Sequence, residues 1–153
     1  MLKQFDLMNA NGVPILREKT EFGNYPACST PEEIVNMLNA VFDAEHLAEE
    51  HTWTVAFNAQ LKPIGIFELA HGTVNASLLS PREIMIRLCL CGAVTFIVAH
   101  NHPGGDVSPS DTDLKTTERI RKAGEIMNIQ LLDHIIVAEH GRYCSLKEYG
   151  VQF

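Results

Sequence analysis

The chain has 153 residues, of which 46% are hydrophobic and 20% are charged, the size and composition of one soluble globular domain rather than a disordered tail. Its 12 basic and 19 acidic residues give a net charge of −7, which argues against a protein that binds mainly to nucleic-acid phosphates. No apolar run approaches the roughly 18–20 residues that cross a bilayer, and the first residues lack the apolar core of a secretory signal, so we expect a cytoplasmic protein.

The first 26 residues contain weak strand patterns interrupted by the turn-forming pair Asn11-Gly12. We expect residues 1–26 to form an N-terminal extension, as a flap or an extra hairpin, in front of a domain that spans residues 27–153.

The next segment predicts a helix followed by two strands. Thr30 and Glu33 match a capping box, and apolar residues follow them at helical spacing, which predicts a helix over residues 30–47. The segments 52–57 and 64–69 are separated by a polar turn, and they predict an antiparallel hairpin.

Two further helix starts are visible. Ser80 and Glu83 match a second capping box that opens a helix through about Cys91, and Ser108 is expected to be the N-cap of a third helix that ends near Asn128. Strands are predicted at residues 94–99, 131–138 and 143–145. Helices interspersed with strands predict an α/β fold in which helices flank a sheet on both faces.

The stretch HNHPGGDVSPSDTD, residues 100–113, directly follows the apolar strand 94–99. His100 and His102 are two residues apart in an extended segment, so their imidazoles leave the chain on the same side. A loop rich in Gly and Pro can fold the start of the third helix, with Asp113, back over this strand end. Two imidazoles and one carboxylate are three protein ligands, the number typical of a catalytic Zn²⁺ that keeps one position open for water.

Hydrolysis at such a site needs two further groups. The metal lowers the pKa of its water toward about 7, a carboxylate outside the metal's ligand set moves the proton, and a donor faces the oxyanion. Ser110, beside Asp113 at the helix start, is placed to be that donor, although it could serve instead as a helix cap.

His100-x-His102, seven residues, Ser110, two residues and Asp113 resemble the JAMM signature of the JAB/MPN metalloprotease superfamily. The wider context is similar to its RadC-like branch, in the motifs His71-Gly72-Thr73, Ser80-Pro81-Arg82-Glu83 and Leu132-Asp133-His134. The resemblance implies a single JAB/MPN-like domain, a cytidine-deaminase-like α/β/α sandwich with a mixed sheet, and it implies Zn²⁺ as cofactor. Inferences about DNA that rest on the helix-hairpin-helix region of many RadC proteins do not transfer to these residues.

The family also implies a glutamate upstream of the histidines as general base and acid. Glu50 is our preferred candidate, because it stands where the family has this residue, at the start of the strand after the first helix. Glu49 is the alternative if that register is wrong by one. Glu68 could face either side of its strand, and Glu83 is better explained by its capping box.

His134 has two interpretations. It is either a buried histidine bonded to backbone, or a residue that contacts a metal ligand and orients it.

Three functions follow from these patterns. The first is a zinc-dependent hydrolase of the metallopeptidase or isopeptidase type, acting on a peptide or isopeptide-linked protein. The second is a metal-binding domain without catalysis that assembles with a partner. The third is an accessory protein in DNA repair, which the acidic charge disfavours. Neither a membrane partner nor a particular oligomeric state is indicated by the sequence.

Overall fold

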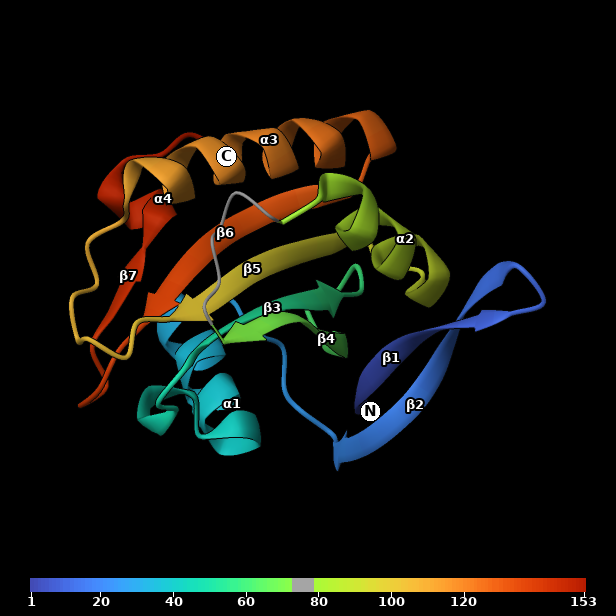
Figure 1. The fold of residues 1–153 in the computed structure, drawn as a ribbon, viewed down its shortest axis with the longest axis horizontal. Helices are drawn as coiled ribbons and strands as arrows, with labels where there is room; N and C mark the ends of the chain where they lie inside the picture. Colours follow the sequence, from blue (N-terminus) through green and yellow to red (C-terminus); the bar gives the residue numbers. More distant parts are fainter. Residues whose placement is uncertain (73–78) are drawn as a thin grey trace.

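Seven strands form one mixed sheet with helices on both faces, and the computed structural model describes residues 1–72 and 79–153 (Figure 1). The strands are β1 (Leu2–Ala10), β2 (Val13–Gly23), β3 (Glu50–Phe57), β4 (Pro63–Gly72), β5 (Thr95–Asn101), β6 (Gln130–Val137) and β7 (Tyr143–Ser145). The helices are α1 (Pro31–Phe42), a 3₁₀ turn η1 (Ala44–His46), α2 (Pro81–Cys91), α3 (Asp111–Met127) and α4 (Leu146–Tyr149). The predicted single α/β domain is confirmed.

The strand order is β2-β1-β4-β3-β5-β6-β7. β5 and β6 are parallel, as are β1 and β4, and the other neighbouring pairs are antiparallel. The link from β5 to β6 passes through α3, so the start of α3 lies next to the carboxyl end of β5. In α/β folds this edge is where ligands are usually bound.

Side chains of the central strands alternate between two apolar cores. Ile97 and Ala99 of β5 belong to the core that includes Leu38 of α1. Phe96 and Val98 belong to the core that includes residues of α2 and α3. Because successive residues of a strand face opposite sides, the even-numbered residues of β5 face α2 and α3. This alternation decides on which face of the sheet each functional residue lies.

The N-terminal residues form the hairpin β1–β2. Asn11 and Gly12 at its tip both have positive φ, 53° and 86°, the pattern of a two-residue turn that suits the twist of the strands. The hairpin joins the rest of the sheet through β1, where Lys3 and Gln4 pair with Gly65 and Ile66 of β4.

The first predicted helix start is confirmed. Thr30 is the N-cap of α1 and forms the expected capping box with Glu33. The helix ends at Phe42 and not at residue 47, because Asp43 takes the left-handed conformation, with φ 52°.

The other two helix starts differ from the prediction. Ser80 is the N-cap residue of α2, but no capping box forms: the N–H of Glu83 donates to the backbone oxygen of Ser80, and the carboxylate of Glu83 binds Arg82 and Arg87. Ser108 is not the N-cap of α3: its N–H donates to Asp106 Oδ1 within the loop, and the helix begins at Asp111.

In the described residues, 1–72 and 79–153, no helix has both the length and the apolar character needed to cross a membrane.

Gly124, in α3, tests how closely this helix packs on the sheet. A Cβ added there would lie 2.5 Å from the backbone oxygen of Ile129 and 3.1 Å from Phe96. Gly124→Ala should therefore lower stability by about 1–3 kcal/mol, although alanine favours helices. Thermal unfolding should show a fall of about 3–10 °C in Tm. Gly104→Ala, where an added Cβ has open space, is the control and should leave Tm nearly unchanged. An unchanged Tm in Gly124→Ala would show that the backbone yields.

Candidate metal centre

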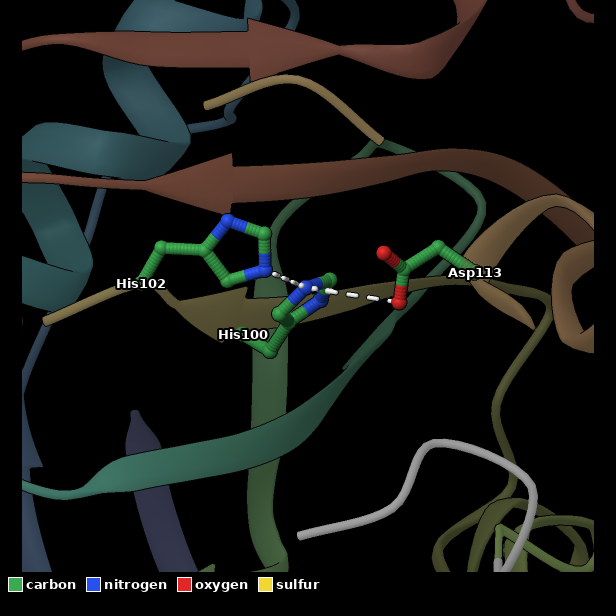
Figure 2. Close-up of side chains that lie close together, drawn as sticks. All are labelled: His100, His102 and Asp113. Carbon is green, nitrogen blue, oxygen red and sulfur yellow. Dashed lines mark hydrogen bonds and ion pairs between the residues drawn. The ribbon is translucent and has the colours of Figure 1, made fainter. Parts of the chain in front are cut away.

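His100, His102 and Asp113 converge at the carboxyl end of β5 (Figure 2). His100 Nε2 lies 2.9 Å from His102 Nε2 and 3.5 Å from Asp113 Oδ1. One ligand atom of each residue lies within 4.8 Å of the other two, and in the described part of the chain no other group of three such residues does so. His100 and Asp113 are buried, and His102 is half-buried. The three predicted ligands therefore form one cluster.

The strand geometry explains the position of both histidines. His100 pairs with Thr52 of β3 and with Ile136 of β6, so its backbone is fixed from both sides. The N–H of His102 donates to the carbonyl oxygen of Val137, which keeps the chain attached to β6 beyond the end of β5. Two-residue spacing then puts both rings on the face of α2 and α3.

The start of α3 supplies the carboxylate. Ser110 is the N-cap: its Oγ accepts from the N–H of Asp113, and its own N–H and O–H donate to Asp113 Oδ2, at 2.8 and 2.6 Å. Because the cap occupies Oδ2, Oδ1 is the atom that faces His100. Ser110 thus acts as a cap in this structure, the alternative role that its sequence position allowed.

A chain of hydrogen bonds fixes the proton on His100. The hydroxyl of Thr117 donates to the carbonyl oxygen of Asp113, so its oxygen must accept from His134 Nδ1, 2.6 Å away. His134 Nε2 is then unprotonated and accepts from His100 Nδ1 at 2.8 Å. His100 therefore carries its proton on Nδ1 and presents a lone pair at Nε2.

His102 reaches the same state by a different contact. Its Nδ1 lies 2.5 Å from the carbonyl oxygen of Asp106, which can only accept a hydrogen bond. The proton of His102 is therefore on Nδ1, and its Nε2 presents a lone pair toward His100 Nε2. Two lone pairs that face each other repel, and a cation between them removes that repulsion.

Burial keeps the rings of His100 and His134 neutral. Burial, then the neighbouring His134 and His102 rings, lowers the pKa of His100 to about 3, although Asp113 opposes this. Burial also lowers the pKa of His134 to about 4. Burial acts to raise the pKa of Asp113, but His100 and the hydrogen bonds from Ser110 outweigh it and lower the pKa below its usual value. Neutral imidazoles and an ionised carboxylate are the forms that bind a metal ion.

The glutamates suggested by the sequence lie at different places. Glu50 is the first residue of β3, two before Thr52, which is opposite His100, so strand alternation puts Glu50 on the face of the triad. Glu68 pairs with Trp53 on the opposite face, and its carboxylate is 2.5 Å from His51 Nδ1. Glu49 is exposed and precedes the strand.

His134 and Thr117 extend the site beyond the predicted residues. The sequence left open whether His134 bonds to backbone or to a ligand, and its ring atoms bond to His100 and Thr117. Thr117 was not predicted. Its only signal is its position four residues after Asp113, which puts both on one face of a helix. Of the motif His71-Gly72-Thr73, Thr73 lies outside the described residues.

Comparison with known proteins adds the family. Residues 28–151 match the RadC-like JAB domain. A UPF0758 protein of Caldanaerobacter subterraneus subsp. tengcongensis is 38% identical over 122 residues, 80% of this chain and 51% of that protein. A UPF0758 protein of Shouchella clausii is 39% identical over 125 residues, 82% of this chain and 53% of that protein. One from Clostridium kluyveri is 36% identical over 128 residues, 84% and 54% of the two chains. The chain thus spans about half the length of the curated relatives it matches.

The contact between His134 and His100 predicts an effect on metal affinity. His134→Ala removes the acceptor for His100 Nδ1–H, so Zn²⁺ affinity measured by chelator competition should fall about 10- to 100-fold. Thr117→Val, which keeps the shape of the side chain, should act in the same direction, and Thr117→Ser should retain affinity. His140→Asn, at an exposed turn where asparagine accepts the left-handed backbone, is the control. Unchanged affinity in His134→Ala would contradict the orienting role.

The buried histidines also predict how stability depends on pH without metal. The folded-state pKa values of His100 and His134 lie below the ordinary 6.5, so the unfolded state binds more protons between about pH 6.5 and 4. Stability should therefore be intact above about pH 6.5 and be lost on acidification, by on the order of 3 kcal/mol for one such histidine. Chemical denaturation of the chelator-treated protein from pH 7.5 to 4.5 measures this. A flat profile would contradict this, because it would mean that the two rings take up protons as readily in the folded state as in the unfolded state.

Proposed function

Because this chain belongs to the RadC-like JAB domain family, we propose that it is a zinc-dependent hydrolase that cleaves an amide bond in a peptide or an isopeptide-linked protein. The observation that supports this most strongly is the pair of imidazole lone pairs that face each other 2.9 Å apart beside an ionised carboxylate. The chemistry of this donor set fits the cofactor, since two nitrogens and one oxygen are ligands that Zn²⁺ takes at catalytic sites.

When bound, Zn²⁺ would act as a Lewis acid and lower the pKa of a water molecule in its open position toward about 7. His100, His102 and Asp113 would hold the ion. The neighbouring residues keep the ligands ready: His134 and the Asp106 carbonyl hold the Nδ1 protons of the two rings, and Ser110 holds the second oxygen of Asp113.

We assign Glu50 the role of accepting a proton from the attacking water and delivering it to the leaving amine. Two observations favour Glu50 over the other glutamates. It begins β3 on the face of the triad by strand register, whereas Glu68 binds His51 on the other face and Glu83 pairs with two arginines. Ser110 is the proposed oxyanion donor, for which its O–H has to turn from Asp113 Oδ2 toward the substrate.

The cytoplasmic location expected from the sequence, the substrate and the assembly with partners remain predictions. The zinc-loaded chain incubated with a peptide library, and with chelator as the control, tests the reaction by mass spectrometry. New amide cleavage that disappears with chelator supports the proposal, and intact peptides in the zinc-loaded sample would support a metal-binding role without catalysis.

Glu50→Gln tests the proposed proton carrier. It keeps size and hydrogen bonding but removes the basic group, so cleavage should fall about 10²- to 10⁴-fold. Zn²⁺ affinity should stay within about threefold because the ligands are untouched. Glu49→Gln, one residue away and exposed, is the matched control and should cleave like the natural chain. Full activity in Glu50→Gln together with loss in Glu49→Gln would move the role by one residue.

A further inference from the structure

Asn101 lies between the two histidines and points to the opposite face of the sheet. It is 2% exposed, and its side-chain amide bonds to the backbone of the segment that leads into β3. Its Oδ1 accepts from the N–H of His51 at 2.6 Å, and its Nδ2 donates to the carbonyl oxygens of Glu49 at 2.9 Å and Leu47 at 3.4 Å. Both polar atoms of this side chain are therefore used on one short stretch of backbone, in which Glu50 lies between the contacted residues Glu49 and His51.

This amide takes the place of a missing strand neighbour. The ladder between β3 and β5 ends at the pair Thr52 and His100. Beyond it, the N–H of His102 bonds to Val137 of β6 and is not available to β3. The Asn101 amide offers an acceptor to His51 and a donor to Glu49, as the peptide group of an adjacent strand does.

The other edge of the same stretch is fixed by β4, where Glu50 pairs with Gly72. With Asn101 on the β5 side, the backbone around Glu50 is held from both edges. Strand alternation then places the side chain of Glu50 on the face of the triad. The side chain of Asn101, which binds the residues on either side of Glu50, lies on the face of α1.

We propose that Asn101 is a positioning residue that holds Glu50 at a fixed distance from the metal centre, and so couples the proton carrier to the strand that bears two ligands. This inference rests on the proposed function, because it assigns Asn101 to the reaction through Glu50. It separates two tasks on adjacent residues: His100 and His102 bind the ion, and Asn101 sets the geometry of the acid–base group.

Hydrogen exchange tests the contact itself. In Asn101→Ala the amide of His51 loses its acceptor, so its exchange should accelerate about tenfold or more. Amides of β3 that face β5 within the ladder, such as that of Val55, which pairs with Ile97, should stay protected. Asn101→Leu, which fills the space without polar atoms, repeats the test if the alanine variant is unstable. Unchanged protection of His51 in the folded variants would overturn the proposal.

The Co²⁺-loaded protein tests the effect on the site without any substrate. The quantity measured is the pH at the midpoint of the change in its visible absorption spectrum. Glu50→Gln takes a negative charge from beside the ion, so the midpoint should fall by about 0.5–1 pH unit. Asn101→Ala or Asn101→Leu, which releases Glu50, should move the midpoint in the same direction by a smaller amount. Co²⁺ affinity should stay within about threefold, because the ligands remain.

A double variant distinguishes positioning from general loosening. If Asn101 acts through Glu50, adding Asn101→Ala to Glu50→Gln should shift the midpoint no further. Thr54→Val is the matched control, since it removes another buried side-chain hydrogen bond between β3 and β5, from Thr54 Oγ1 to Ile97 O at 2.9 Å. It should lower Tm and leave the midpoint unchanged.

The outcomes are separable. This inference would be overturned if the Asn101 variants bind Co²⁺ with an unchanged pH midpoint, or if the shifts add in the double variant. Either result would leave the proposed hydrolase intact. Loss of Co²⁺ affinity in Asn101→Ala would also overturn it, by showing that the residue supports the ligands. Failure of the natural chain to bind Co²⁺ would contradict both the metal centre and this inference.

Discussion

The structure of this site depends on one electrostatic constraint, the opposition of two imidazole lone pairs. His100 Nε2 and His102 Nε2 face each other at 2.9 Å, and each ring has its proton fixed on the far nitrogen. His134 accepts the proton of His100, and the carbonyl oxygen of Asp106 accepts that of His102. Without a cation this arrangement is repulsive, so the surrounding fold must hold it in place. A preformed metal site requires that its ligands be held in place in this way.

A network of hydrogen bonds surrounds these two imidazole rings and Asp113. Thr117 binds the carbonyl oxygen of Asp113 and His134 Nδ1, and His134 in turn binds His100, so the bonds connect α3 to β5 through β6. Ser110 holds the second oxygen of Asp113 and begins α3 in the same step. A cap that is needed for helix stability therefore also orients a ligand. Hydrogen bonds to the side chains that ligate a metal usually affect how tightly the metal is bound.

Residues 100–102, at the end of β5 and just beyond it, face alternate sides of the sheet and so have different roles. His100 and His102 face α2 and α3, and Asn101 faces α1, from where its amide reaches the backbone beside Glu50. A shift of one residue in the register would exchange these faces and dismantle the site. The resemblance to the RadC-like branch, first based on the motifs at residues 71–73, 80–83, 99–113 and 132–134, is confirmed by the match over residues 28–151.

The sequence by itself indicated most of the helices and strands and the three residues of the candidate metal cluster, because spacing within a short segment governs them. His100 and His102 share a face in any extended chain, and Asp113 follows after one short loop. Which serine caps α3 was left open for a local reason: Ser108 and Ser110 both suit an N-cap, and in the structure Ser108 stays in the loop by its bond to Asp106 while Ser110 binds the N–H of Asp113. Only the tertiary structure decided the partner of His134 and the face of Glu68, since both depend on which strands are neighbours and in what register. Contacts between residues far apart in the chain have no local pattern, and so the sequence left them open.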